Sequence, residues 1–156
     1  MTWRTYTCEV SNKPAIVLID QQFENRFPVP ELPLLSWFGV YCNLPPDGSC
    51  LAEAETDSLD HVENQLIELA GQFGRGWAVY VFRIATPGIR EYCIYHSAEA
   101  EMSKAYDALK VGVPNYRIEF ETTNDASWDQ YRRYSAFKEK KAPLLGRITK
   151  LFGGKE

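Results

Sequence analysis

The order of hydrophobic patterns between residues 34 and 121 constrains the fold more than any other feature of the sequence. Apolar strand-like runs and two helical stripes follow one another there as strand, helix, strand, strand, helix, strand. This is the βαββαβ order of a ferredoxin-like unit, in which two helices cover one face of an antiparallel sheet. We therefore expect an α+β fold with strands at 34–43, 77–84, 89–96 and 115–121 and helices at 57–73 and 98–111.

Each predicted helix carries its own start and stop signals. In the first, apolar side chains recur at steps of three and four residues, Asp57 can cap the free N–H groups, and Gly71 or Gly74 can end the helix. In the second, Ser97 can cap the first turn and Gly112 can end the last. These signals predict two amphipathic helices that pack on the sheet.

Turn chemistry predicts a hairpin in the middle of the chain. Pro87 and Gly88 suit a type II turn, because proline fixes φ and glycine accepts a positive φ. The last strand, 115–121, alternates between apolar and charged residues, which predicts one buried and one wet face. The central hairpin and this strand should therefore lie in the same sheet.

A second hairpin is predicted at the N-terminus, from strands at 3–10 and 15–20 joined by a turn at 11–14. It should either extend an edge of the sheet or cover its other face. Its second strand is apolar on both faces, so we expect it to be buried. Three prolines mark 21–33 as a surface loop, and a short helix is expected near 125–134.

The charge of the chain is unevenly distributed. Residues 1–137 carry 11 basic and 19 acidic side chains, a net charge of −8, whereas residues 138–156 carry 6 basic and 2 acidic, a net charge of +4. We therefore expect a single α+β domain at 1–137 and a basic amphipathic tail at 138–156. The apolar face at 144–152 predicts a frayed tail, a last helix packed on its own domain, or contact with a membrane surface or partner.

Composition and charge exclude several classes of function. An acidic body repels phosphate backbones, so we expect no nucleic-acid partner. Residues 75–82 resemble an RNA-binding signature, but that signature belongs on the third strand of a βαββαβ unit and here lies on the second. No apolar run reaches the ~18 residues of a membrane span. Because the N-terminus also lacks the apolar segment of a signal peptide, we expect a cytoplasmic protein.

The four cysteines and two histidines show no spacing of metal ligands. Nothing in the sequence brings Cys50 within hydrogen-bond reach of His61, as a nucleophile–base pair requires. Cys93 and His96 lie three residues apart on a strand and so point to opposite faces. The acidic residues at 53–63 should interact with the positive end of a helix dipole, and we do not expect them to bind a divalent metal. We therefore predict no catalytic residue, metal site or cofactor.

One group of residues on the central hairpin suits a small ligand. With the turn at 87–88, Arg83 and Tyr92 pair and share a face of the sheet. Arginine, histidine and aromatic side chains on that face could hold an anion, and the candidates are Trp77, Arg83, Arg90, Tyr92 and His96. The alternative is that Arg83 and Arg90 lie at the wet end of the sheet and pair with Glu or Asp.

Several short motifs occur in a fixed order between residues 3 and 134. They are Trp3-x-x-Tyr6, Lys13-Pro14-Ala15, Asp47-Gly48, Leu59-x-x-x-Glu63-x-x-Leu66, Gly88-x-Arg90-Glu91-x-x-x-Tyr95 and Asp125-x-x-Trp128-x-x-Tyr131. Together they resemble the domain-of-unknown-function family 695. Two loops depart from the family pattern: Ser49-Cys50 stands where a proline is usual, and Ser135-Ala136-Phe137 where Leu-Pro is usual.

The resemblance implies no activity and no catalytic residue. Some family members resemble fusions with a domain like the ribonuclease E activity regulator B family, which points to regulation by protein binding. Our leading hypothesis is therefore a non-enzymatic protein-interaction or regulatory module, whose acidic surface suits a basic protein partner. The alternative is a small anionic ligand-binding domain or an uncharacterised enzyme that uses the central hairpin.

Overall fold

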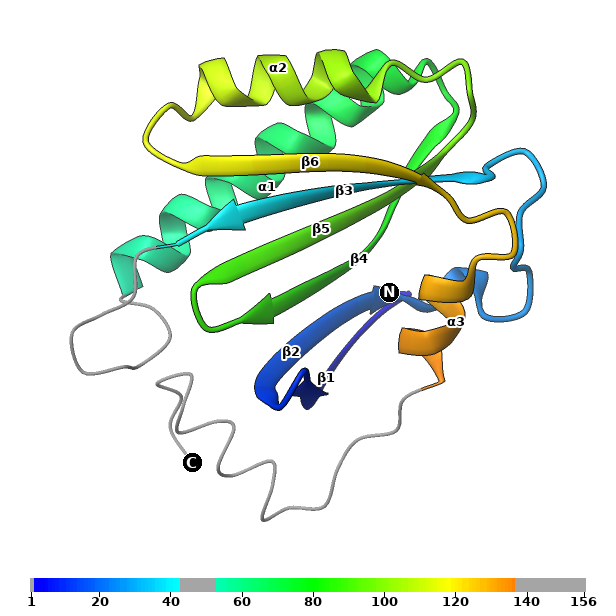
Figure 1. The fold of residues 1–156 in the computed structure, drawn as a ribbon, viewed down its shortest axis with the longest axis horizontal. Helices are drawn as coiled ribbons and strands as arrows, with labels where there is room; N and C mark the ends of the chain where they lie inside the picture. The colour runs from blue at the N-terminus through cyan, green and yellow to red at the C-terminus, as the bar shows by residue number, and fades with distance from the viewer. Residues whose placement is uncertain (1, 43–52, 137–156) are drawn as a thin grey trace.

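The computed structural model describes residues 2–42 and 53–136 and shows an α+β fold with a six-stranded antiparallel sheet and three α-helices (Figure 1). The strands are β1 (Trp3–Val10), β2 (Lys13–Asp20), β3 (Leu34–Tyr41), β4 (Ala78–Thr86), β5 (Ile89–His96) and β6 (Arg117–Asn124). The helices are α1 (Glu53–Gly74), α2 (Met102–Gly112) and α3 (Asp129–Ser135), with a 3-10 turn, η1, at Gln21–Phe23. The strands lie in the order β1-β2-β4-β5-β3-β6.

The N-terminal hairpin extends one edge of the sheet, because β2 pairs with β4 as well as with β1. Its turn consists of Ser11 and Asn12, with φ of 51° and 65°, and is shorter than predicted. Such two-residue turns match the twist of the strands they join. The expected burial of β2 is complete on one face only: Val17 is fully buried, whereas Ile16 and Leu18 on the opposite face are half-buried.

Both long helices differ from prediction at their N-termini. Helix α1 begins at Glu53, so Asp57 lies within the helix and does not cap it. Helix α2 begins at Met102, because residues 97–101 form a separate turn in which the Glu99 N–H donates to Ser97 Oγ at 3.2 Å. The predicted C-terminal glycines are confirmed: α1 ends at Gly74 and α2 at Gly112.

The central hairpin has the predicted turn. Thr86 pairs with Ile89, and Gly88 between them has a φ of 92°, which an L side chain rarely adopts. One irregularity interrupts the ladder. The register of β4 against β5 shifts between Tyr80 and Phe82, so Val81 is an extra residue in a β-bulge.

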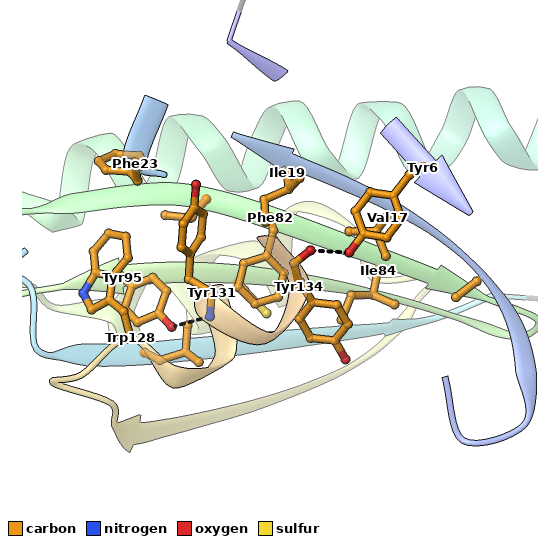
Figure 2. Packing of buried hydrophobic residues seen from close by; sticks show 14 of the residues in the cluster. Tyr6, Val17, Ile19, Phe23, Phe82, Ile84, Tyr95, Trp128, Tyr131 and Tyr134 are labelled. Atoms are coloured by element: carbon orange, nitrogen blue, oxygen red, sulfur yellow. Dashed lines mark hydrogen bonds between the residues drawn. The ribbon is translucent and has the colours of Figure 1, made fainter. Parts of the chain in front are cut away.

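The sheet has a hydrophobic core on each face. Helices α1 and α2 cover one face, where side chains such as Leu59, Leu66 and Leu109 pack against Phe38 and Ile94. On the other face, α3 and the segment around η1 cover β2, β4 and part of β5 (Figure 2). The labelled side chains of this second core are Tyr6, Val17, Ile19, Phe23, Phe82, Ile84, Tyr95, Trp128, Tyr131 and Tyr134.

Some predictions concern residues that the structure does not describe. The tail at 138–156 with its apolar face at 144–152, Cys50 and the Asp47-Gly48 motif all lie outside the described ranges. Within those ranges, none of the helices is both long enough and apolar enough to cross a bilayer.

Candidate functional site

Four of the five predicted ligand-binding residues lie on the sheet face that α1 and α2 cover. Arg83 and Tyr92 pair in the β4–β5 register, as predicted. Arg90 and His96 lie on the same face as Tyr92, because alternate residues of a strand share a face. Trp77 is not brought to this group: it precedes β4 and is 47% exposed.

The β-bulge at Val81 explains the different position of Trp77. Simple alternation from Arg83 would place Trp77 on the helix-facing side of the sheet. The extra residue reverses the alternation before it, so that Ala78 and Tyr80 take the helix-facing positions instead. A one-residue insertion of this kind leaves no clear signal in a strand that is apolar on both faces.

Both arginines are paired with carboxylates of α1. Arg83 Nη1 lies 2.5 Å from Glu63 Oε1, and both side chains are largely buried. Arg90 Nη1 lies 3.4 Å from Asp60 Oδ1, and Arg90 itself is 8% exposed. Burial alone would lower the pKa of Arg83, but the carboxylate of Glu63 outweighs it and the pKa is raised. The arginines thus do pair with Glu and Asp, but beneath α1 and not at a wet end of the sheet.

The face beneath α1 also holds polar atoms without partners. Among the described residues, the hydroxyl groups of Tyr80 and Tyr92 and the Nε atoms of Arg83 and Arg90 are buried and have no hydrogen bond. The two tyrosine rings are 6.2 Å apart. Burial raises the pKa of Tyr92 to about 12 and that of Tyr80 well above its usual value, so both phenols are neutral donors at pH 7.

His96 belongs to a buried chain of hydrogen bonds. Its Nδ1 lies 2.8 Å from the Ser97 carbonyl oxygen, so Nδ1 carries the proton and Nε2 accepts from the Ser36 hydroxyl at 2.7 Å. Ser36 Oγ in turn lies 2.8 Å from Thr122 Oγ1. Ser36 is 0% exposed and His96 3%, so this serine–histidine pair is closed to a substrate. Burial lowers the pKa of His96 and keeps the ring neutral.

The acidic residues in the first part of α1 bind different partners. Glu55 accepts a hydrogen bond from the Tyr116 hydroxyl at 2.6 Å, whereas Glu63 and Asp60 pair with arginines. In the described part of the chain, no three His, Cys, Asp or Glu side chains come together as a metal site. An exposed His61 instead lines a pocket of about 410 Å³ with Asn115 from the loop after α2.

A second pocket, of about 190 Å³, lies on the opposite face of the sheet beside α3. Its apolar wall is formed by Leu35, Phe82, Ile84 and Cys93, and α3 borders it with Tyr134. The charged group in the pocket is the carboxylate of Glu91, whose Oε1 accepts a hydrogen bond from Trp37 Nε1 at 2.9 Å, and the polar residues Thr123 and Gln130 also line it. The Trp37 ring lies against Gly39, where any Cβ would collide with it.

Sequence reasoning did not single out this second pocket. Glu91 belongs to one of the short motifs, and Trp37 lies in the strand predicted at 34–43, but neither residue was predicted to form a site. The signal that could have identified Glu91 is its place on the strand: it alternates with Cys93 and Tyr95, so an acid interrupts an otherwise apolar face. Its contact with Trp37 joins residues 54 positions apart, which no local pattern predicts.

Comparison with known proteins gives one match. The model of a family of unknown function, DUF695, matches residues 1–134. The chain belongs to the DUF695 family. No curated protein and no solved structure matches it.

The DUF695 motifs have a structural explanation in this chain. The Tyr95 hydroxyl donates to Asp125 Oδ2 at 2.6 Å and accepts from the Tyr131 N–H at 3.2 Å. The Trp128 ring stacks on Tyr95 with centroids 4.0 Å apart, and the Tyr6 hydroxyl donates to the Tyr134 carbonyl oxygen (Figure 2). These residues therefore attach α3 to the sheet.

Arg90 and Glu91, which are also motif residues, do not take part in that attachment. Arg90 pairs with Asp60 under α1, and Glu91, its neighbour on β5, faces the pocket beside α3. Since adjacent strand residues point to opposite faces, this dipeptide supplies one charge to each side of the sheet. The charge of Glu91 faces an open pocket.

Proposed function

We propose that this protein is a non-enzymatic interaction or regulatory module that binds a basic protein partner. The proposed binding surface, called the acidic face below, is the part of the α3 side of the sheet formed by β3, β5 and β6 beyond α3. Its members are Trp37, Tyr41, Glu91, Glu119 and Glu121. The single observation that carries the proposal is that aromatic and acidic side chains gather on a sheet face that no described helix covers.

The chemistry of the acidic face supports a protein partner. Trp37 and Tyr41 are half-buried, and such aromatic side chains are frequent anchors of protein interfaces. Three glutamates stand beside them, and Arg117 offsets one of these by pairing with Glu119 at 2.8 Å. The remaining negative charge would steer a basic partner towards this face and weaken its binding as salt rises.

Site-specific photo-crosslinking in cells tests this proposal. A benzoylphenylalanine residue in place of Glu121, which is exposed on the acidic face, should give an adduct with a basic protein. The same residue in place of Glu68, which is exposed on α1, is the matched control and should give none of that adduct. The same adducts from both positions, or no adduct from position 121, would refute the proposal.

One observation favours a second candidate function, the binding of a small anion beneath α1. The hydroxyl groups of Tyr80 and Tyr92 and the Nε–H groups of Arg83 and Arg90 are donors without partners in the described structure. An anion between them would satisfy several donors at once. A thermal-shift screen with phosphate, sulfate and carboxylate metabolites tests this function, and no stabilisation by any of them would remove it.

We also propose that β3, α1, β4, β5, α2 and β6 form a ferredoxin-like unit to which the N-terminal hairpin is added. The run β6-β3-β5-β4 within the sheet and the position of both long helices on one face support this.

A cytoplasmic location is proposed as well. It is supported by the free thiols of Cys42 and Cys93, since reduced cysteines are usual in that compartment.

A further inference from the structure

Glu91 is a half-buried carboxylate without a counter-ion in the described structure. Glu63 on the helix-covered side is paired with an arginine, whereas the buried Asp20, which also has no ion pair there, accepts hydrogen bonds from the backbone N–H and the side-chain amide of Gln22. Among the described residues, Glu91 has one hydrogen bond, from Trp37 Nε1, and no ion pair. Burial raises its pKa, with the Trp37 hydrogen bond opposing. A half-buried carboxylate without a counter-ion is costly unless something else supplies the opposite charge.

The pocket around Glu91 limits what that charge can be. Its volume of about 190 Å³ is smaller than the roughly 300–1,000 Å³ of typical small-molecule sites, so it fits one side chain better than a cofactor. The wall of Leu35, Phe82 and Ile84 is apolar, whereas the Trp37 ring can attract a cation. A long side chain with an apolar stem and a cationic end matches these surroundings.

We propose that this pocket receives one lysine side chain of a partner protein, with the ammonium group on Glu91 and the methylene stem against the apolar wall. The inference rests on the proposed function, since it names the chemistry by which the basic partner is held. Lysine fits better than arginine because Oε1 of Glu91 already accepts from Trp37. Oε2 has no hydrogen bond in the described structure, which suits a point charge, whereas a guanidinium binds best to two carboxylate oxygens at once and would share Oε1 with Trp37.

Titration of the full-length, ¹⁵N-labelled protein with n-butylammonium chloride tests the pocket directly. This probe is a lysine side chain without its backbone. We expect saturable shifts of the Trp37 indole N–H and of the Glu91 and Cys93 amides. 1-Butanol, which has the stem without the charge, and ethylguanidinium should each bind at least tenfold more weakly. Sodium chloride at equal ionic strength should give no saturable shift.

Matched variants assign the effect to Glu91. Glu91→Gln should fold at least as stably as the parent protein, because it removes a desolvated charge, and should lose at least tenfold in affinity for n-butylammonium. Glu121→Gln, on the same face outside the pocket lining, and Glu68→Gln, on α1, should stay within about twofold of the parent protein.

Several results would overturn the inference. They are unchanged n-butylammonium binding by a folded Glu91→Gln, equal binding of 1-butanol, tighter binding of ethylguanidinium, or shifts confined to the pocket at His61. These outcomes are separate from those of the crosslinking experiment. A basic adduct at position 121 without n-butylammonium binding would leave the proposed function and remove the lysine pocket. Binding of n-butylammonium without any adduct would remove the protein partner, and with it the lysine, and would leave only a pocket that binds a small ammonium ion.

Discussion

Tyr95 is the residue that joins α3 to the sheet most directly. Its hydroxyl group donates to the Asp125 carboxylate and accepts from the Tyr131 N–H. The same carboxylate also accepts the N–H groups of Asp129 and Gln130, at 2.9 and 3.1 Å. One phenol and one carboxylate thus satisfy three N–H groups in the first turn of a helix, where such groups otherwise lack partners.

Removal of this hydroxyl group should be costly. Tyr95→Phe leaves the Tyr131 N–H buried without an acceptor and takes one donor from Asp125, so we expect a loss of ~1–3 kcal/mol in the free energy of unfolding. Urea denaturation measures it. Tyr41→Phe is the control, because it removes an equivalent hydroxyl–carboxylate bond, to Glu119, from a more open part of the same face. Equal losses in the two variants would contradict this account of Tyr95.

His96 should make stability depend on pH. Burial lowers its pKa in the folded state, so below its ordinary pKa of ~6.5 the unfolded chain binds a proton that the folded chain does not. The free energy of unfolding should therefore fall as the pH falls from ~6.5 towards the lower folded pKa. Between pH 7 and 5, the free energy of unfolding of His96→Asn should fall less than that of the parent protein. Urea denaturation measures both. A slope in His96→Asn equal to that of the parent protein would contradict the assignment.

At the scale of elements, helix α3 depends on its contacts with the sheet. It has seven residues, far fewer than an isolated helix needs in water. Trp128, Tyr131 and Tyr134 bury their side chains in the core beneath it, and Trp128 Nε1 donates to the Leu32 carbonyl oxygen at 2.9 Å. The helix is therefore a product of tertiary packing and not of local propensity.

Truncation of Trp128 should show this dependence. Trp128→Ala removes a 0%-exposed ring from between Tyr95 and Phe23, so we expect a loss of ~3–5 kcal/mol in the free energy of unfolding. Trp77→Ala, at a 47%-exposed position, is the matched control and should cost less than about 1 kcal/mol. Both values come from urea denaturation. A small loss for Trp128→Ala would mean that α3 is dispensable to the core.

The buried ion pair between α1 and β4 gives a second prediction at this scale. Arg83→Met leaves the carboxylate of Glu63 buried without its partner, so we expect a loss of ~3–5 kcal/mol. Addition of Glu63→Leu to that variant should restore most of the loss, because two apolar side chains then replace two charges. Denaturation of the two single variants and the double variant measures the coupling. A double variant as unstable as the sum of the single ones would contradict the pairing.

Element order and most strand bounds are predictable from the sequence, because strand alternation and turn residues are local signals. The start of α1 was missed since Glu53, Glu55 and their neighbours favour a helix, and acidic residues suit its first turn, so the helix continues past the plausible cap at Asp57. The bulge at Val81 was missed because both faces of β4 are apolar. The first error concerns where a helix begins, and the second concerns where the alternation of a strand reverses. Neighbouring residues specify both positions only weakly.

The candidate site was less predictable than the fold. Arg83 and Tyr92 were correctly paired because one short turn determines their register. Their carboxylate partners on α1 depend on how the helix lies across the sheet, which a local pattern does not contain. The pocket at Glu91 requires β3, β5 and α3 together. Long-range pairing of this kind is visible only in the folded molecule.

For the whole molecule, the two sides of the sheet differ in how their charges are satisfied. On the side of α1 and α2, the carboxylates of Asp60 and Glu63 are matched by arginines. On the side of α3, the acidic face keeps a half-buried carboxylate at Glu91 and an exposed one at Glu121, neither of which has an ion pair among the described residues. This asymmetry is the basis for placing partner binding on the α3 side.

The pKa of Glu91 tests this account most directly. It can be measured by ¹³C NMR of the side-chain carboxyl group as a function of pH, with and without saturating n-butylammonium. We predict a pKa above the ordinary glutamate value in the free protein, since burial without a counter-ion disfavours the charged form, and a decrease when the cation binds. A pKa at or below the ordinary value in the free protein, or one that the cation leaves unchanged, would contradict the account.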